Sequence, residues 1–359
     1  MSFLNETPSV LAIADKIQNN ERLNYNDALT LYNEASLHLL GVLAHQIRMK
    51  KHPNNIVTYV ADRNINYSNV CVCACRFCAF FRPPDHEQGY VLSKEELKEK
   101  IEETIALGGT QILMQGGHHP HLPLSFYEDM LSYIRNEFPS IHIHAFSPPE
   151  IYFFAQKEGI DTKEVIKRFI GAGLHSIPGG GAEILVDRVR KQVSPNKCPA
   201  QDWLNIMLEA HELGLKTTAT MMFGHEETKE ERLEHLFAVR KTQDKSNGFT
   251  AFIPWTFQAE NTNINVPPTP AMEYLRILAL SRLVLDNIPN IQASWVTMGA
   301  QVAQLALYFG ANDFGSLMIE ENVVAAAGVS FSLSREDIHK TIIAAGFEPR
   351  QRYMDYQLV

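Results

Sequence analysis

Short apolar runs alternate with amphipathic stretches from about residue 56 to the end of the chain. The runs are rich in β-branched residues, which is typical of buried strands. The stretches between them place an apolar residue at every third or fourth position, which predicts helices. This regular alternation predicts a parallel sheet covered by helices. We expect strands at 57–60, 111–114, 141–146, 176–177, 216–223, 250–255 and 291–295, with 312–317 as a candidate eighth.

Several of the predicted helices begin with a hydroxyl or carboxylate residue that is followed three positions later by a glutamate. In such a capping box each side chain bonds the backbone amide of the other residue, so the pattern marks a helix start. The boxes are Ser93 with Glu96, Ser125 with Glu128, Asp161 with Glu164, and Thr228 with Glu231. Further helices are expected at 183–190, 201–213, 272–286 and after Ser334.

The first 50 residues or so lack this alternation and are predicted to be helical. Apolar residues from Ala28 to Val42 recur every three or four positions, which predicts one helix over 25–44 capped by Asn24 or Asn26. No stretch rich in Pro, Gly or Ser interrupts the strand–helix units, so we expect one barrel-like α/β domain instead of two. The expected division is a helical cap at 1–55, the barrel at 56–300 and a C-terminal completion at 301–359.

Composition and charge narrow the range of partners. The 359-residue chain has a formal net charge of -9, which weighs against nucleic acid because nucleic-acid binders usually present a basic patch. No apolar run reaches the roughly 18 residues of a membrane span. Residues 1–6 show no basic stretch followed by an apolar one, so they do not resemble a signal peptide. We therefore expect a cytoplasmic protein without a membrane or nucleic-acid partner.

Four of the five cysteines fall within eight positions, which indicates metal binding more than disulfides. Cys71, Cys75 and Cys78 have the spacing C-x3-C-x2-C. Three thiolates can hold three irons of a [4Fe–4S] cluster and leave the fourth iron open to a small molecule. Cys73 is out of step with this spacing and is expected to be a bystander. The alternative is a zinc-stabilised binding protein that uses two or three of these cysteines with His86, but we find no second ligand pair at recognisable spacing.

The cysteine spacing, with an aromatic residue before the last cysteine, is the signature of the radical S-adenosylmethionine (SAM) enzymes. Three further stretches resemble the branch that contains the futalosine-pathway menaquinone enzymes and the deazaflavin (FO) synthases. They are 62–70, 114–120 (Met-Gln-Gly-Gly-His-His-Pro) and 176–185 (Ser-Ile-Pro-Gly-Gly-Gly-Ala-Glu-Ile-Leu). The similarity covers nearly the whole chain after about residue 25, and it implies a TIM-like radical SAM barrel.

The same resemblance implies residues that bind SAM. The glycine pair at 116–117 matches the segment that receives the amino group of SAM, and glycine lets a backbone approach a ligand closely because it has no Cβ. The glycines at 179–181 are expected to open a helix whose N-terminus could bind an anion. The SAM-binding residues implied are Phe77, Gln115, Gly116, Gly117, Glu183 and Arg188.

Functional residues of a parallel α/β barrel lie at the carboxyl ends of its strands. His142 and His144 share one strand face, so both would point into the barrel if Ile143 meets the helices, and there they could bind substrate or shuttle protons. The candidates for a catalytic base are His118, His119, His144 and His225, all near strand ends or on this face. The candidates for substrate contacts are Tyr67, Thr218, Trp255 and Phe257.

The resemblance finally implies an activity, which is that of a radical cyclase. A 5′-deoxyadenosyl radical from SAM would abstract the ribose C4′ hydrogen of dehypoxanthine futalosine, and the sugar radical would add to the benzoate ring to give the cyclic product of menaquinone biosynthesis. A [4Fe–4S] cluster and SAM are the implied cofactors, and a reduced flavodoxin- or ferredoxin-type protein is the implied electron donor. Within the branch, an aminofutalosine synthase or an FO synthase subunit is the alternative, although the versions of the motifs found here favour the cyclase.

Overall fold

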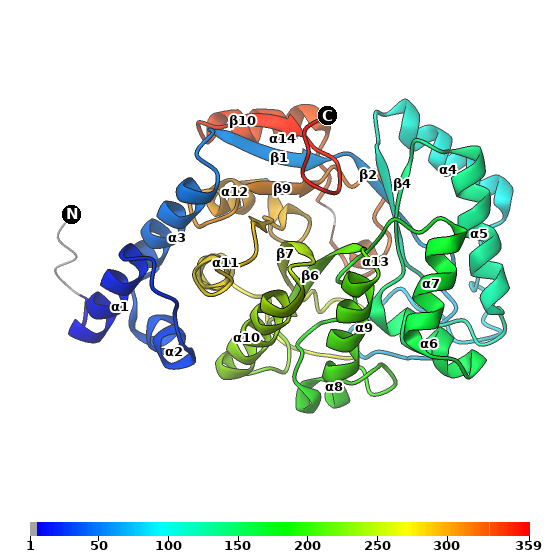
Figure 1. Ribbon diagram of the computed structural model, residues 1–359, viewed down its shortest axis with the longest axis horizontal. Helices are drawn as coiled ribbons and strands as arrows, with labels where there is room; N and C mark the ends of the chain where they lie inside the picture. The colour runs from blue at the N-terminus through cyan, green and yellow to red at the C-terminus, as the bar shows by residue number, and fades with distance from the viewer. Residues whose placement is uncertain (1–5, 330) are drawn as a thin grey trace.

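The computed structural model describes residues 6–329 and 331–359, so the first five residues, on which the expectation about a signal peptide depends, lie outside the described part. A parallel seven-stranded sheet curls into a partial barrel with helices outside it, in the strand order β2-β3-β4-β5-β6-β7-β8 (Figure 1). This confirms the predicted α/β barrel class. The strands are β2 (Asp62–Ile65), β3 (Gln111–Met114), β4 (His142–Ala145), β5 (Ser176–Ile177), β6 (Lys216–Phe223), β7 (Phe249–Thr256) and β8 (Asn290–Ile291).

A second, three-stranded sheet stands beside the first one. In it β1 (Ile56–Val60) lies between β10 (Glu348–Gln351) and β9 (Asp313–Ser316), and all pairings are parallel (Figure 1). An isolated bridge between Gln292 and Asp313 connects this sheet to the end of β8. The candidate eighth strand is therefore formed as β9, but its strand partner is β1.

The strand expected at 57–60 is formed as β1, but a separate strand that was not expected, β2, leads to the cysteine loop. Strand β2 was not predicted because it begins with three polar residues, Asp62 to Asn64, and therefore does not form an apolar run. Asp62 is buried in a strand because its carboxylate accepts a 2.6 Å hydrogen bond from Nε2 of Gln111 on β3, which offsets the cost of burying the polar group.

Most of the helices cover the outside of the barrel, and the first three helices of the chain, α1 to α3, extend to one side of it (Figure 1). Two of the predicted capping boxes form as expected, Ser93 with Glu96 and Thr228 with Glu231. The helices are α1 (Pro8–Gln18), α2 (Tyr25–Glu34), α3 (Leu37–Lys51), α4 (Lys94–Ala106), α5 (Leu124–Glu137), α6 (Pro148–Glu158), α7 (Thr162–Ala172), α8 (Asp187–Val193), α9 (Ala200–Glu212), α10 (Lys229–Ser246), α11 (Ala271–Val284), α12 (Trp295–Ala306), α13 (Val323–Ala326) and α14 (Arg335–Ala344).

Two helix starts and one long helix differ from the prediction. Ser125 lies inside α5, because the helix begins one residue earlier after Pro123, whose fixed φ suits a helix entry. Asp161 does stand at the N-cap of α7, but its side chain makes no capping bond. The single helix expected over 25–44 is two helices, α2 and α3, because Ala35 is extended and the hydroxyl of Ser36 caps α3.

The sequence pattern does not predict α6 or α12. Helix α6 begins with two prolines after Ser147, which suits a first turn but looks like a loop in the sequence. Helix α12 follows a strand of only two residues and has a non-helical residue at Gly299. Both helices begin close to the carboxyl ends of strands, so they border the region where the functional residues were expected.

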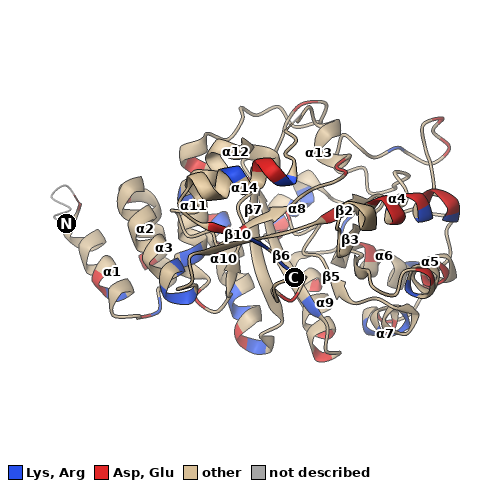
Figure 2. Cartoon of the chain, turned by 90° about the horizontal axis from the view of Figure 1, so that it is seen from above, with Lys and Arg blue, Asp and Glu red and all other residues tan. Residues whose placement is uncertain are grey.

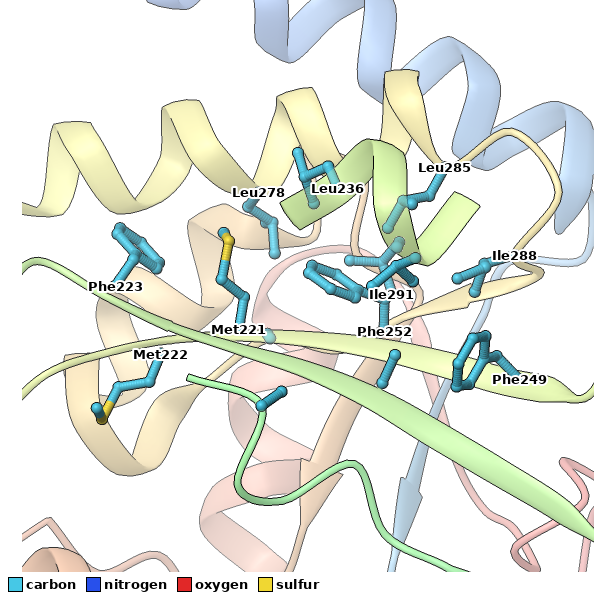
Figure 3. Packing of buried hydrophobic residues seen from close by; sticks show 14 of the residues in the cluster. Met221, Met222, Phe223, Leu236, Phe249, Phe252, Leu278, Leu285, Ile288 and Ile291 are labelled. Carbon is cyan, nitrogen blue, oxygen red and sulfur yellow. The ribbon is translucent and has the colours of Figure 1, made fainter. Parts of the chain in front are cut away.

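The core lies between the sheet and its helices. Met221 on β6 and Phe252 on β7 point toward Leu236 of α10 and Leu278 of α11, and all four side chains are fully buried (Figure 3). Methionine fills irregular gaps between such elements because it has three flexible bonds. Helix α3 packs on α11 from the other side, which attaches the N-terminal helices to the barrel.

The outer helices carry acidic and basic positions interspersed with each other (Figure 2). One charged network joins the N-terminal helices to the barrel, since Arg22 donates to both Asp244 and Asp286 at distances of 2.6 to 3.0 Å. Within the described residues, no helix is long and apolar enough to span a membrane.

Candidate active site

A cavity of about 410 Å³ extends through the inside of the curled sheet. At one end it is lined by the loops that follow β2, β3 and β5, where the carboxyl ends of parallel strands meet. At the other end it reaches Asp62 and Gln111, the first residues of β2 and β3. The cavity therefore spans the height of the sheet.

The cysteine loop forms the roof of the cavity at the first end. Cys71, Cys75 and Cys78 all line the cavity. Cys73 is absent from the lining, but its buried thiol lies within hydrogen-bond reach of those of Cys71 and Cys75, and its Sγ is 2.9 Å from Nδ1 of His118. Its role as a bystander stays a prediction. The backbone amide of His118 donates to Sγ of Cys71 at 3.3 Å, so the loop after β3 holds the cysteine loop in place.

The donor set fits an iron–sulfur cluster better than a single metal ion. Within the described residues, no three His, Cys, Asp or Glu side chains are close enough together to hold one ion. A cubane cluster instead needs thiolates spread around one volume, as the three cavity-lining cysteines are. The zinc alternative, with His86, loses support, because His86 lines a separate recess with His119 and His121.

Gly116 and Gly117 line the cavity, and they also explain how the cysteine loop is seated. A Cβ on Gly117 would overlap the carbonyl oxygen of Val70, and one on Gly116 would overlap the ring of Tyr67. Both positions therefore need glycine because other parts of the chain pack directly against their backbone, whether or not a ligand also does so.

A buried ion pair lies beside the cysteines. Nζ of Lys197 is 3.0 Å from Oε1 of Glu183 and 5.0 Å from the ring centroid of Phe77, and all three residues line the cavity. Burial lowers the pKa of Lys197, but the negative charges of Cys75 and Glu183 outweigh burial and raise it above its usual value. Lys197 is thus charged inside the site. No pattern in the sequence indicates this role, because Lys197 is a lone lysine in a loop.

The structure does not bring Arg188 to the cavity. Its guanidinium makes two hydrogen bonds to Glu231, at 2.6 and 2.5 Å, and remains half exposed. The expectation failed because the segment before it is a loop and α8 begins only at Asp187, so the glycines at 179–181 open no helix. Arg190 points inward instead and lies 3.6 Å from Glu183.

Two of the four histidine candidates line the cavity, namely His118 and His144. Burial lowers the pKa of each to about 3, so both are neutral near pH 7. His225 lies outside the cavity lining, with Nδ1 3.1 Å from Glu227 and its ring against Phe257. His119 borders the separate recess.

The substrate candidates divide in the same way. Thr218 and Trp255 line the cavity, and Gln115 lies there beside Gly180. Tyr67 lies beneath the lining, where its hydroxyl donates a 2.6 Å hydrogen bond to the buried carboxyl of Glu150. Phe257 packs against His225 outside the cavity.

The C-terminal tail forms the other end of the cavity, which the sequence analysis did not foresee. Arg352 is buried and donates two hydrogen bonds to Asp313, at 2.5 and 3.1 Å. Tyr356 stacks on its guanidinium with the charge 3.9 Å from the ring centroid. Both tail residues line the cavity, so the last strand and the residues after it close the barrel where its strands begin.

The chain is similar to known families and proteins whose chemistry matches the cysteine site. Residues 65–239 match the model of the radical SAM superfamily, and residues 246–359 match the CofH/MqnC C-terminal region. The chain is 46% identical to the cyclic dehypoxanthine futalosine synthase of Halalkalibacterium halodurans, over 98% of this chain and 95% of that protein. It is 42% identical to the protein of the same name from Streptomyces coelicolor, over 99% and 90% of the two chains.

The fold is also found among solved structures. The X-ray structure of the FeFe-hydrogenase maturase HydG from Carboxydothermus hydrogenoformans superposes with a TM-score of 0.75. The match covers 97% of this chain and 80% of that one, at 17% sequence identity. This similarity concerns the barrel architecture alone.

Proposed function

This chain belongs to the radical SAM superfamily, and on that premise we propose that it is a cyclic dehypoxanthine futalosine synthase. Such an enzyme joins C4′ of the ribose to the benzoate ring of dehypoxanthine futalosine in menaquinone biosynthesis. The observation that carries the proposal is the near full-length identity of 46% to a relative with that name. The cavity supports it, because three cysteines with the radical SAM spacing meet there.

When bound, the [4Fe–4S] cluster and SAM supply the 5′-deoxyadenosyl radical that takes the C4′ hydrogen. Cys71, Cys75 and Cys78 would hold the cluster. We infer that Lys197 binds the carboxylate of SAM, since it is a charged, buried donor beside the cysteines, and that Glu183 binds a positively charged or hydroxyl group of SAM.

The walls of the cavity exclude water and hold the substrate. Trp255 and Trp295 offer flat apolar faces to an aromatic ring, and Phe80 covers the cavity beside the cysteine loop. Holding the ribose and the ring together in one enclosed volume favours cyclisation over competing reactions of a sugar radical. Thr218 lines this volume and has a hydroxyl that can bond the sugar.

Two other assignments compete with this one. An aminofutalosine synthase or an FO synthase subunit would have the same cluster and SAM but a different substrate, and a zinc-stabilised binding protein would have neither. The proposal includes an electron donor of the flavodoxin or ferredoxin type, because cleavage of SAM requires one electron, and the two sister enzymes would need one as well.

The test is an anaerobic reconstitution with iron and sulfide, followed by incubation with SAM, dithionite and dehypoxanthine futalosine. We expect 5′-deoxyadenosine and the cyclised product to appear together by mass spectrometry, and both to be lost in Cys75→Ala. Deoxyadenosine without cyclised product would refute the substrate assignment while keeping the family chemistry. A colourless protein that binds zinc and no iron would refute the enzyme assignment.

A further inference from the structure

A chain of hydrogen bonds leads from the cavity to the outside of the barrel through two histidines and a serine. Oγ of Ser176 lies 2.6 Å from Nδ1 of His144 and 2.7 Å from Nε2 of His142. The two histidines point to the same side of β4, and Ser176 is the first residue of the neighbouring strand β5. One hydroxyl thus connects both imidazoles.

The two ends of this chain have different surroundings. His144 is 5% exposed and lines the cavity, and within the described residues its Nε2 has no hydrogen-bond partner. His142 is outside the cavity lining and only partly buried, at the level where β4 begins. Its ring lies 5.0 Å from that of the half-buried His175. The chain therefore begins at the cavity and ends near solvent.

The proposed cyclisation needs such an exit, and this inference rests on that proposed function. After C4′ bonds to the benzoate ring, the ring carbon that was attacked still carries its hydrogen. To regain aromaticity the ring must lose that hydrogen as a proton and one electron, and the oxidised [4Fe–4S] cluster is the one-electron acceptor. The positive charge of SAM is consumed in the reaction, so each turnover releases one proton in the cavity.

We propose that His144 accepts this ring proton and that Ser176 and His142 conduct a proton from it to solvent. Nε2 of His144 takes the proton as the ring C–H bond breaks, and its Nδ1 proton passes to Oγ of Ser176. The hydroxyl proton of Ser176 passes to Nε2 of His142, whose Nδ1 proton goes to water. His144 and His142 are then neutral, each with its proton on Nε2. When product release admits water, each imidazole exchanges that proton for one on Nδ1, which resets the chain with no further net gain or loss of a proton.

His118 and Glu150, which also line the cavity, are less suited to this role. Nδ1 of His118 faces the thiol of Cys73, and the ring of His118 is packed on Phe153 at 4.9 Å. The carboxyl of Glu150 is occupied by Tyr67, by the amide of Gly116 and by Ser147. Neither has a comparable connection to the outside. Burial lowers the pKa of His144 to about 3 and that of His142 to about 4, so both imidazoles are neutral at rest and each keeps one ring nitrogen without a proton.

The test uses four variants of the reconstituted enzyme, which are His144→Gln, His142→Gln, Ser176→Ala and its conservative counterpart Ser176→Thr. Each is examined for the ratio of cyclised product to deoxyadenosine and, by freeze-quench electron paramagnetic resonance, for a ring-centred substrate radical. Removal of a general base costs about a hundredfold in rate, so we expect His144→Gln to lower the ratio by about that factor and to accumulate the radical. Ser176→Ala should lower the ratio about tenfold, and Ser176→Thr, which keeps the hydroxyl, should restore it.

A matched control is available outside the cavity. His211 lies between Ser246 and Thr217, with its ring nitrogens 2.6 and 2.7 Å from their hydroxyls, and His211→Gln should leave the ratio unchanged. An unchanged ratio without radical in Ser176→Ala or His142→Gln would overturn the conduction path, and the same result in His144→Gln would overturn the base. If the unmodified enzyme forms deoxyadenosine but no cyclised product, the proposed function fails instead. Imidazole ¹⁵N spectra of the full-length cluster-free chain give an independent readout, since Ser176→Ala should shift both histidines.

Discussion

Lys197 and Glu183 form an ion pair inside the cavity, with Nζ of the lysine 3.0 Å from Oε1 of the glutamate. The side chains are 15% and 5% exposed, so water screens the pair little. The lysine would satisfy only part of its bonding capacity through this pair, because an ammonium group donates three hydrogen bonds. The other N–H bonds of the ammonium group are available to a ligand, which is the role proposed for the carboxylate of SAM.

Replacement of Lys197 should therefore weaken the binding of SAM. In Lys197→Met the carboxylate of SAM would lose a buried charged partner, and loss of one such bond costs about 1.5–3 kcal/mol, or about 10- to 100-fold in Kd. Equilibrium dialysis of SAM against the reconstituted enzyme measures this. Lys191→Met, on the exposed face of α8, is the control, and equal SAM affinity in both variants would contradict the assignment.

Gly117→Ala should prevent the cysteine loop from closing. The added methyl group would overlap the carbonyl oxygen of Val70, directly before the first cysteine, so the loop must shift. We expect iron and sulfide content after reconstitution to fall to a small fraction of the wild-type value. Gly171→Ala is the matched control, because a Cβ there meets no atom within 4 Å. Full cluster content in Gly117→Ala would show that the loop adapts.

Arg352→Met should destabilise the whole barrel. It would leave the carboxylate of Asp313 buried without its charged partner, which costs about 3–5 kcal/mol. The midpoint of urea unfolding should fall accordingly. Arg350→Met removes an arginine two residues away that is exposed and paired only with Glu348 at the surface, and it should change the midpoint little. Equal midpoints in the two variants would rule out a structural role of the tail.

Stability should decrease as the pH falls from 7.5 to 5.5. Burial lowers the pKa of several histidines in the folded state. These histidines become protonated near pH 6.5 in the unfolded chain but stay neutral in the folded protein, so acid favours the unfolded state. Each such group costs about 1 kcal/mol at pH 5.5. The histidines and their folded pKa values are His52 at about 4, His142 at about 4, His144 at about 3, His211 at about 4 and His235 at about 3.

Urea unfolding at several pH values, at constant cluster content, measures this slope. Burial raises the pKa of Asp62, Glu150 and Glu321, which acts in the opposite direction, but these carboxyls are fewer than the histidines. His235→Gln should flatten the slope by the share of one group, because His235 is fully buried. Stability that rises toward pH 5.5 would contradict the prediction.

Local sequence signals predicted the elements that depend on local physics. The box of Thr228 and Glu231 forms because its bonds connect residues three apart, and β6 was predicted with its observed bounds because its residues suit a buried strand. Strand β2 was missed, since Asp62 is acceptable in a strand only when Gln111 from another strand bonds it. That bond is not visible in a window of sequence.

The same distinction explains the site. The three cysteines are recognisable because a cluster needs their spacing within one loop. Lys197 acquires its role from Glu183 and Phe77, which reach it through the fold. Arg188 was a wrong choice because the helix that carries it starts later than expected, so the inward position is that of Arg190.

The pairing of β1 with β10 has a consequence for the time at which the enzyme can mature. Strand β1 precedes the cysteine loop, but its residue Ile56 pairs with Glu348, close to the end of the chain. Translation must deliver nearly every residue before this pair can form, and contacts between such distant residues also form late in folding. The cavity is closed by the tail that follows β10. Iron and sulfide delivered before β10 is synthesised would meet an incomplete barrel, so we expect cluster insertion to follow the synthesis of β10.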